Sequence, residues 1–187
     1  MKIGILGGTF DPPHFAHKEI AVRAKTQFGL SKVIFIPTGN PWQKSPISNS
    51  EHRYNMTNLL IEDTNEFQVS RIELDSSRET YTVDTLKELN YDSENLFFIL
   101  GADTALGIKS WKSFLELGNL CQFLIAPRHG VDKNKLGKEF PFDYLEIAGP
   151  ELDISSTNVR ELLIDGENLN KKIPTNILEY IQTHSLY

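Results

Sequence analysis

The sequence predicts an α/β protein in which helices cover both faces of a mostly parallel β-sheet and a small helical portion follows at the C-terminal end. Three observations predict this fold. Short apolar runs alternate with amphipathic segments along the chain of 187 residues. Several runs are apolar at consecutive positions, as strands buried on both faces are. Alternation of strands and helices indicates βαβ units, which build parallel sheets.

The apolar runs are the predicted strands. In chain order they are KIGIL (2–6), KVIFI (32–36), FQVSRIEL (67–74), LFFIL (96–100) and QFLIA (122–126). From 128 to 149 the pattern weakens into a predicted loop region with one short strand candidate, YLEIA (144–148). Another long loop, PTGNPWQKSPISNS (37–50), is rich in Pro, Ser and Asn, and such connections are commonly functional.

The amphipathic segments are the predicted helices. They are HKEIAVRAKTQF (17–28), SEHRYNMTNLLIED (50–63), TVDTLKEL (82–89), SFLELGNL (113–120), ISSTNVRELL (154–163) and IPTNILEYIQTHSLY (173–187). Gly29 is placed to end the first helix, and Ser48 and Glu51 have capping-box spacing before the second. No repeat or linker divides the chain. We therefore expect one Rossmann-like domain over 1–187, with its C-terminal helical part at about 150–187.

Charge and cysteine content exclude several classes of protein. The net charge is −6 and the Lys and Arg residues are scattered, which argues against a nucleic-acid-binding groove. Cys121 is the single cysteine, so a disulfide framework and a cysteine zinc site are excluded and a buried core thiol is favoured. No run is long enough to span a membrane and no signal peptide is evident, so a cytoplasmic protein is predicted.

The segment GGTFDPPHFAH (7–17) directly follows the first predicted strand. In an open α/β sheet, the loop after the first strand is a preferred phosphate site. Gly7 and Gly8 let backbone N–H groups approach an anion because no Cβ stands in the way. The two prolines delay the helix, so that His14 falls in its first turn and shares a face with His17.

Two imidazoles at a helix N-terminus favour a polyphosphate site. The helix dipole disfavours a cationic imidazole there unless a bound anion compensates it, and both rings could donate hydrogen bonds to charge that develops in a transition state. Taken singly, the glycines also fit an ordinary turn and each histidine fits a surface or core position. A metal pair is a further alternative, with only Asp11 and Glu19 nearby as additional ligands. The spacing excludes both the G-x-G-x-x-G and the P-loop motifs.

GGTFDPPHFAH resembles the nucleotidyltransferase superfamily signature, in which a Gly-rich turn leads to an H-x-G-H element that binds and activates the ATP phosphates. Ala16 stands here in place of the glycine. Later segments are similar to motifs of the bacterial nicotinate-nucleotide adenylyltransferases: ETYTVDTLKEL (79–89), GADTALGIKSW (101–111), IAPRHG (125–130), ISSTNVR (154–160) and ILEYIQTHSLY (177–187). The resemblance covers nearly the whole chain in the same order.

The resemblance implies an ATP site. The residues expected to bind ATP are Gly7, Gly8, Thr9, Phe10, Gly101, Asp103, Ile154, Ser155, Ser156, Thr157 and Arg160. The expected catalytic residues are His14, His17, Lys44 and Arg160. Within this set, the resemblance implies that Lys44 contacts the β- and γ-phosphates and that Arg160 stabilises the leaving pyrophosphate. Without the resemblance, Lys44 fits a solvated loop charge, Arg160 a surface residue, and Asp103 a helix N-cap.

The resemblance also implies a site for the acceptor. The expected mononucleotide-binding residues are Tyr81, Thr82, Asp103, Trp111 and Arg128. Trp111 is expected to stack on the pyridine ring, and the turn at Tyr81 and Thr82 to present backbone N–H groups to the nicotinate carboxylate. A core position is the alternative for Trp111.

The implied reaction is adenylyl transfer from ATP to nicotinate mononucleotide, which gives deamido-NAD and pyrophosphate. Mg²⁺ is expected to bind with ATP, mainly through phosphates and water, so no metal site built from side chains is predicted. The alternatives are nicotinamide mononucleotide as the acceptor, a phosphopantetheine adenylyltransferase, and a nucleotide-binding sensor without catalysis. No nucleic acid or membrane partner is expected. A homo-oligomer is compatible with the sequence, which leaves open the oligomeric state, the preference for acid over amide, motion of the 37–50 loop, and regulation.

Overall fold

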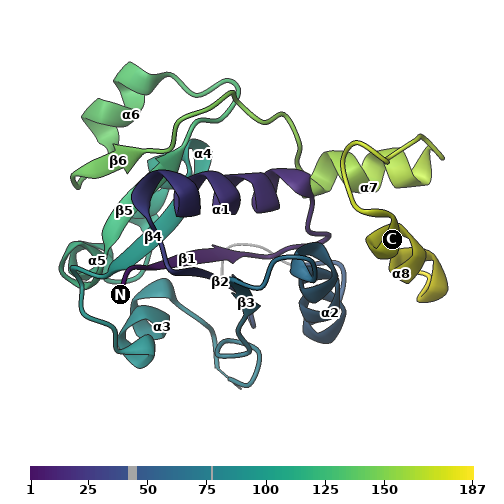
Figure 1. The fold of residues 1–187 in the computed structure, drawn as a ribbon, viewed down its shortest axis with the longest axis horizontal. Helices are drawn as coiled ribbons and strands as arrows, with labels where there is room; N and C mark the ends of the chain where they lie inside the picture. The colour runs from purple at the N-terminus through teal and green to yellow at the C-terminus, as the bar shows by residue number, and fades with distance from the viewer. Residues whose placement is uncertain (42–45, 77) are drawn as a thin grey trace.

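The computed structural model describes residues 1–41, 46–76 and 78–187. Within these residues, parallel strands form a six-stranded sheet in the order β3-β2-β1-β4-β5-β6. The strands are β1 (Ile3–Gly8), β2 (Lys32–Pro37), β3 (Phe67–Val69), β4 (Leu96–Gly101), β5 (Gln122–Ala126) and β6 (Tyr144–Glu146). Helices lie on both faces of the sheet, so the predicted fold class is confirmed (Figure 1).

The helices are α1 (Phe15–Phe28), α2 (Ser50–Ile61), α3 (Thr82–Leu89), α4 (Ala102–Leu106), α5 (Phe114–Leu120), α6 (Lys133–Glu139), α7 (Ser156–Ile164) and α8 (Thr175–Thr183), with a 3₁₀ turn at Ile108–Ser110. Helix α1 ends as predicted at Gly29, whose left-handed conformation (φ 64°) suits a residue without a Cβ. In the part of the chain that the structure describes, no helix has the length and apolar character needed to cross a membrane.

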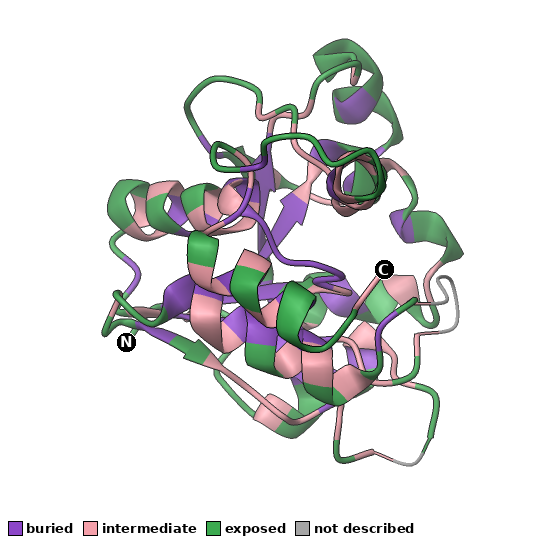
Figure 2. Cartoon of the chain, turned by 90° about the vertical axis from the view of Figure 1, so that its right-hand side faces the viewer, coloured by how far each residue is buried: buried purple, intermediate pink, exposed green. Residues whose placement is uncertain are grey.

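The sheet separates two apolar cores because successive side chains of a strand point to opposite faces. Ile3 and Ile5 of β1 pack into one core with Val83 of α3. Leu6 of β1 packs into the other core with Ala21 of α1. Figure 1 accordingly shows α1 and α3 on opposite sides of β1. In Figure 2 the strands are mostly buried, whereas the helices are buried along one side only.

Several boundaries differ from the sequence-based predictions; the helix expected at 173–187, for example, spans only Thr175–Thr183. The strand expected at 67–74 ends at Val69, because the chain then turns with the Leu74 N–H donating to the Arg71 carbonyl over 2.8 Å. Helix α2 is capped by Asn49 instead of Ser48, since the Asn49 side chain accepts from the His52 N–H at 3.0 Å. His14 is the N-cap of α1 and lies just before its first turn.

Two helices were not predicted. Helix α6 lies in the region expected to be a loop, where it is capped by the Asp132 side chain and buries only Leu136. Helix α4 has five residues. Neither segment is long enough to show a helical hydrophobic period, which needs about 11 residues or more.

Candidate functional site

Two cavities lie at the carboxyl edge of the sheet, and the turn Gly7–Thr9 after β1 lines both of them. The first, called here the histidine cavity, has a volume of about 490 Å³ and is also lined by Asp11, His14, His17, Pro46, Ile47, Gly101, Asp103, Arg128, Ser155, Ser156, Thr157 and Arg160. The second, the tryptophan cavity, has a volume of about 170 Å³ and is also lined by Glu73, Thr80, Tyr81, Thr82, Thr85, Phe98, Trp111 and Lys112.

The start of α1 holds the two imidazoles against each other. The rings of His14 and His17 are stacked, with centroids 3.7 Å apart and planes 24° apart. The His14 backbone N–H donates to Nδ1 of His17 at 3.2 Å. A ring nitrogen that accepts a hydrogen bond carries no proton, so neutral His17 bears its proton on Nε2. The helix terminus therefore fixes both the orientation and the tautomer of His17.

His14 is 3% exposed, and its Nδ1 atom has no hydrogen-bond partner among the described residues. Burial lowers the pKa of His14 well below its usual value, and the nearby charges of His17 and Arg128 lower it further. The imidazole is therefore neutral at neutral pH. An anion bound in the histidine cavity would counteract these causes and favour the cationic form.

The low pKa of His14 predicts a pH-dependent stability that a His14→Gln variant lacks. Below about pH 6.5 the unfolded chain takes up a proton at this histidine, but the folded chain does not until the pH reaches the lowered pKa. The free energy of unfolding of the wild type is expected to fall relative to the variant by up to about 1.4 kcal/mol per pH unit across that window. Urea unfolding of both proteins from about pH 7.5 to 5 measures this; a pH-independent difference would contradict it.

The start of α7 docks against the segment that joins the Gly-rich turn to α1. Ser155 caps the helix by accepting from the Asn158 N–H at 3.1 Å. The Ser156 hydroxyl donates to the Pro12 carbonyl at 2.9 Å, and Arg160 Nη1 donates to the Asp11 carbonyl at 2.7 Å. These contacts bring the N-terminus of a nine-residue helix to the wall of the histidine cavity. The N–H groups of such a terminus are ready to receive phosphate oxygens.

Arg128, which was expected to bind the mononucleotide, lines the histidine cavity. It does not line the tryptophan cavity, which holds Tyr81, Thr82 and Trp111. Its Nη1 donates to the carbonyl of Ile154 at 3.0 Å, and its Nε lies 3.8 Å from a carboxylate oxygen of Asp103. Ile154 therefore reaches the site through its backbone. Asp103 lies in the first turn of α4, whose N-cap is Gly101.

Phe10 and Lys44 differ from the other expected ATP-site residues. The Phe10 side chain belongs to the core, is 1% exposed, and packs edge-on against the His17 ring at 4.9 Å. It supports the site from behind, and its ring also lies against Gly8, where an added Cβ would come within 3.2 Å of the ring atoms. Lys44 lies outside the residues that the structure describes.

The tryptophan cavity combines an aromatic wall with a helix N-terminus. Trp111 packs edge-on against Phe98 at 6.1 Å, and its ring is partly exposed to the cavity. Tyr81 is the N-cap of α3, so the first N–H groups of this helix, beginning at Thr82, lack intrahelical acceptors. A flat ring with an attached carboxylate matches this pair of features.

The sequence did not predict the structural contacts of three buried charged residues of the site, although it gave Asp11 as an alternative metal ligand. Arg53 of α2 is 1% exposed and donates to the carbonyls of Thr9 at 2.8 Å and Thr38 at 2.6 Å. It thereby joins the loops that follow β1 and β2. A signal was present, because Arg53 lies on the buried face of α2, which is mostly apolar, about one turn before Met56.

Glu73 and Asp11 are the other two. Glu73 is 8% exposed and lines the tryptophan cavity, where it accepts from the Thr85 hydroxyl at 2.7 Å. Burial raises the pKa of this carboxyl group. Asp11 is 3% exposed and lines the histidine cavity. No local pattern distinguishes these carboxylates from surface residues, since the contacts that bury them come from distant segments.

Comparisons with known proteins agree on one group. The model of the family described as cytidylyltransferase-like matches residues 5–162. A probable nicotinate-nucleotide adenylyltransferase of Thermoanaerobacter sp. (strain X514) is 39% identical over 199 residues, covering all of this chain and 94% of the relative. One of Dehalococcoides mccartyi (strain CBDB1) is 39% identical over 198 residues, covering all of this chain and 97% of the relative.

Solved structures agree as well. The nicotinic acid mononucleotide adenylyltransferase of Plasmodium falciparum complexed with NaAD has a TM-score of 0.82 and 28% identity, and the match covers all of this chain and 97% of that one. The same enzyme complexed with APC has a TM-score of 0.78, with coverage of 100% and 96%.

Proposed function

Because the chain belongs to the nicotinate-nucleotide adenylyltransferases of the cytidylyltransferase-like family, we propose that it transfers the adenylyl group of ATP to nicotinate mononucleotide. The products are nicotinate adenine dinucleotide and pyrophosphate, a step of NAD biosynthesis. One observation carries this proposal: the turn Gly7–Thr9 lines both the histidine cavity and the tryptophan cavity. A triphosphate in the first and a pyridine nucleotide in the second would meet at this turn.

The reaction needs positioning and charge stabilisation. The phosphate of the mononucleotide attacks the α-phosphorus of ATP in line, a P–O bond forms, and the bond to the bridging α–β oxygen breaks to release pyrophosphate. The nucleophile is already an anion, so no general base is required. We propose that the glycine N–H groups cradle the α-phosphate and that Nε2–H of His17 and the guanidinium of Arg160 stabilise the charge that develops on the departing group; their position in the histidine cavity supports this.

Magnesium is proposed to enter with the nucleotide. Within the described ranges, no three His, Cys, Asp or Glu side chains are grouped to hold a metal ion. Of the two carboxylates in the histidine cavity, Asp11 already accepts from backbone N–H groups and Asp103 lies near Arg128. These two carboxylates fit a Mg²⁺ ion that is held mainly by phosphates and water. Asp103, which is exposed, is the carboxylate that could add a ligand. When bound, the ion neutralises charge on the phosphates.

The acceptor is proposed to bind in the tryptophan cavity. The indole of Trp111 provides a face for the pyridine ring, and the N-terminus of α3 at Thr82 provides N–H donors for the carboxylate. The nearby Asp84 carboxylate pairs with Lys112 at 3.0 Å. Its charge is thereby offset, which favours an acid over an amide in this cavity. We also propose a cytoplasmic location, where ATP is available.

The test is pyrophosphate release with ATP and magnesium, measured with nicotinate mononucleotide, nicotinamide mononucleotide and phosphopantetheine at equal concentrations. A strong preference for the first supports the proposed reaction and acceptor site. Preference for another acceptor would keep the ATP half of the proposal and overturn the acceptor half. No release with any of the three would leave a nucleotide-binding protein without this activity.

Replacing Trp111 with alanine is expected to raise KM for the mononucleotide about tenfold and to leave KM for ATP nearly unchanged. Stacking on an aromatic side chain contributes about 1–3 kcal/mol per base, and a pyridine ring offers a similar face. Steady-state kinetics with each substrate varied in turn measure the two constants. Trp111→Phe, which keeps a ring, should recover part of the loss. Equal increases for both substrates would refute the stacking role.

A further inference from the structure

Asp11 joins segments that are far apart in the sequence. Its carboxylate accepts from the Ile47 N–H at 2.6 Å and from the Ser48 N–H at 3.3 Å. The Tyr187 hydroxyl donates to the same carboxylate at 2.6 Å. Because Asp11 is 3% exposed, these protein donors replace the water that an ionised carboxylate otherwise requires. The aspartate is thus held from two sides, by the loop before α2 and by the segment after α8.

The position of Asp11 links these contacts to the histidine cavity. It lies two residues after the turn Gly7–Thr9 and three residues before His14. Its carbonyl oxygen accepts a hydrogen bond from Arg160, so both the side chain and the backbone of Asp11 are hydrogen-bonded. Ile47, which its side chain holds, lines the same cavity. A change in the orientation of the Asp11 side chain would therefore move one wall of the phosphate site.

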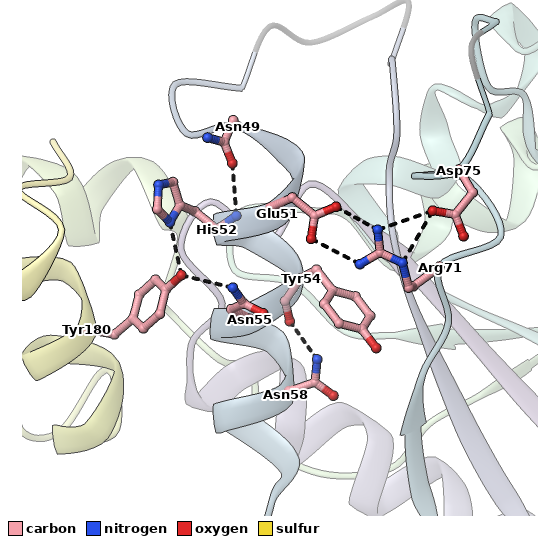
Figure 3. A network of polar contacts seen from close by, with 9 residues as sticks. All are labelled: Asn49, Glu51, His52, Tyr54, Asn55, Asn58, Arg71, Asp75 and Tyr180. Carbon is pink, nitrogen blue, oxygen red and sulfur yellow. Dashed lines mark hydrogen bonds and ion pairs between the residues drawn. The ribbon is translucent and has the colours of Figure 1, made fainter.

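The segment that carries Tyr187 is itself anchored. Helix α8 packs on α2, where the Tyr180 hydroxyl lies 2.9 Å from Nδ1 of His52 and accepts from the Asn55 amide at 3.1 Å (Figure 3). The chain then turns back, and the Leu186 N–H donates to the Ile181 carbonyl at 3.0 Å. Burial and the hydrogen bond to Asp11 raise the pKa of the Tyr187 phenol, so it stays a proton donor at physiological pH.

We propose that Tyr187 is a positioning residue for ATP: by donating to Asp11 it fixes the carboxylate that holds the wall at Ile47 and Ser48 onto the histidine cavity. This inference rests on the proposed function, because it assigns the cavity to the triphosphate. Without the phenol donor, the buried carboxylate loses one of the three donors that the described residues supply, and its side chain is no longer held from the α8 side. The loss falls on ATP, since Asp11 and Ile47 line the histidine cavity and not the tryptophan cavity.

The test compares Tyr187→Phe with Tyr180→Phe in the full chain. Each substitution removes one hydroxyl from the same C-terminal part, but only Tyr187 contacts Asp11. We expect Tyr187→Phe to weaken ATP binding about five- to tenfold, measured by calorimetry without the acceptor, and to leave KM for the mononucleotide within about twofold. Tyr180→Phe should leave both constants near the wild-type values, because the buried Ile177 and Ile181 still hold α8 in the core. Similar ATP affinities in the two variants would overturn the proposal.

A double-mutant cycle separates positioning from a general loss of stability. Asp11→Asn should weaken ATP binding as well, because an amide offers one acceptor oxygen where the carboxylate offers two. If Tyr187 acts through Asp11, adding Tyr187→Phe to Asp11→Asn should weaken ATP binding little further. Additive losses would overturn the proposed route. Calorimetry with ATP alone keeps this test independent of the acceptor, so a failure of the proposed adenylyl transfer would be recognised separately by the absence of product from the wild type.

Discussion

Replacing His17 with alanine is expected to lower kcat about 10²-fold while mononucleotide binding stays nearly intact. The loss matches the removal of one preorganised donor to a transition state, which lowers rates by about 10²–10³. His17 is preorganised because the His14 N–H occupies its Nδ1 at 3.2 Å and the Phe10 ring packs against its edge. The donor therefore needs no reorientation as charge develops. Single-turnover measurement of pyrophosphate formation tests the chemical step directly.

His129 provides a matched control for this prediction. It follows β5 on the same edge of the sheet but is exposed and does not line the histidine cavity. His129→Ala should retain the wild-type kcat. A His17→Ala variant with normal kcat would rule out the assigned role, whereas a rise in KM for ATP without a change in kcat would indicate that His17 binds the ground state and the transition state equally.

Replacing Arg53 with methionine is expected to lower the free energy of unfolding by about 3–5 kcal/mol. Methionine fills similar space but leaves the carbonyls of Thr9 and Thr38 without their donors in a buried region. Folded domains are stable by only about 5–15 kcal/mol, so the loss is a large part of the total. Urea or thermal unfolding measures the change. We expect activity to fall too, since both loops border the cavities.

Arg71 is the control for Arg53. It also carries several hydrogen bonds, to Glu51 and Asp75, as Figure 3 shows, but these lie at the exposed surface. Water replaces such partners readily, so Arg71→Met should leave the free energy of unfolding close to the wild-type value. If the two variants were destabilised equally, burial would not be the cause of the effect at Arg53.

The strands were predicted well because each apolar run is continuous and is bounded by polar residues. Strand β3 was extended too far: Ile72 and Leu74 continue the apolar pattern, but the chain turns there and buries Glu73. Helix α6 was missed because a seven-residue helix with one buried side chain shows no period. Cap geometry at Asn49 depends on which side chain turns toward the helix, and two candidate residues in succession leave this open.

The sequence predicted those segments of the site that are recognisable as local motifs. The Gly-rich turn, the paired histidines and the start of α7 all lie at the carboxyl ends of parallel strands or beside them, so topology alone brings them to one edge. Arg53, Glu73 and Asp11 depend instead on contacts between segments separated by 12 or more residues. Such partners become visible only when the chain is folded. The roles assigned to individual residues remain predictions for the experiments above.

The two cavities draw on different parts of the chain, and this arrangement has an evolutionary consequence. Apart from the shared turn and Thr104, the histidine cavity is built largely from residues 11–17 and 155–160 with Gly101 and Asp103, whereas the tryptophan cavity takes its distinctive residues from 73–100 and 111–112. On the proposed assignment of the two cavities, substitutions at 73–100 or 111–112 can remodel the acceptor pocket while the residues of the nucleotide half are kept. The fold thus behaves as a module for activating a triphosphate with an interchangeable acceptor half.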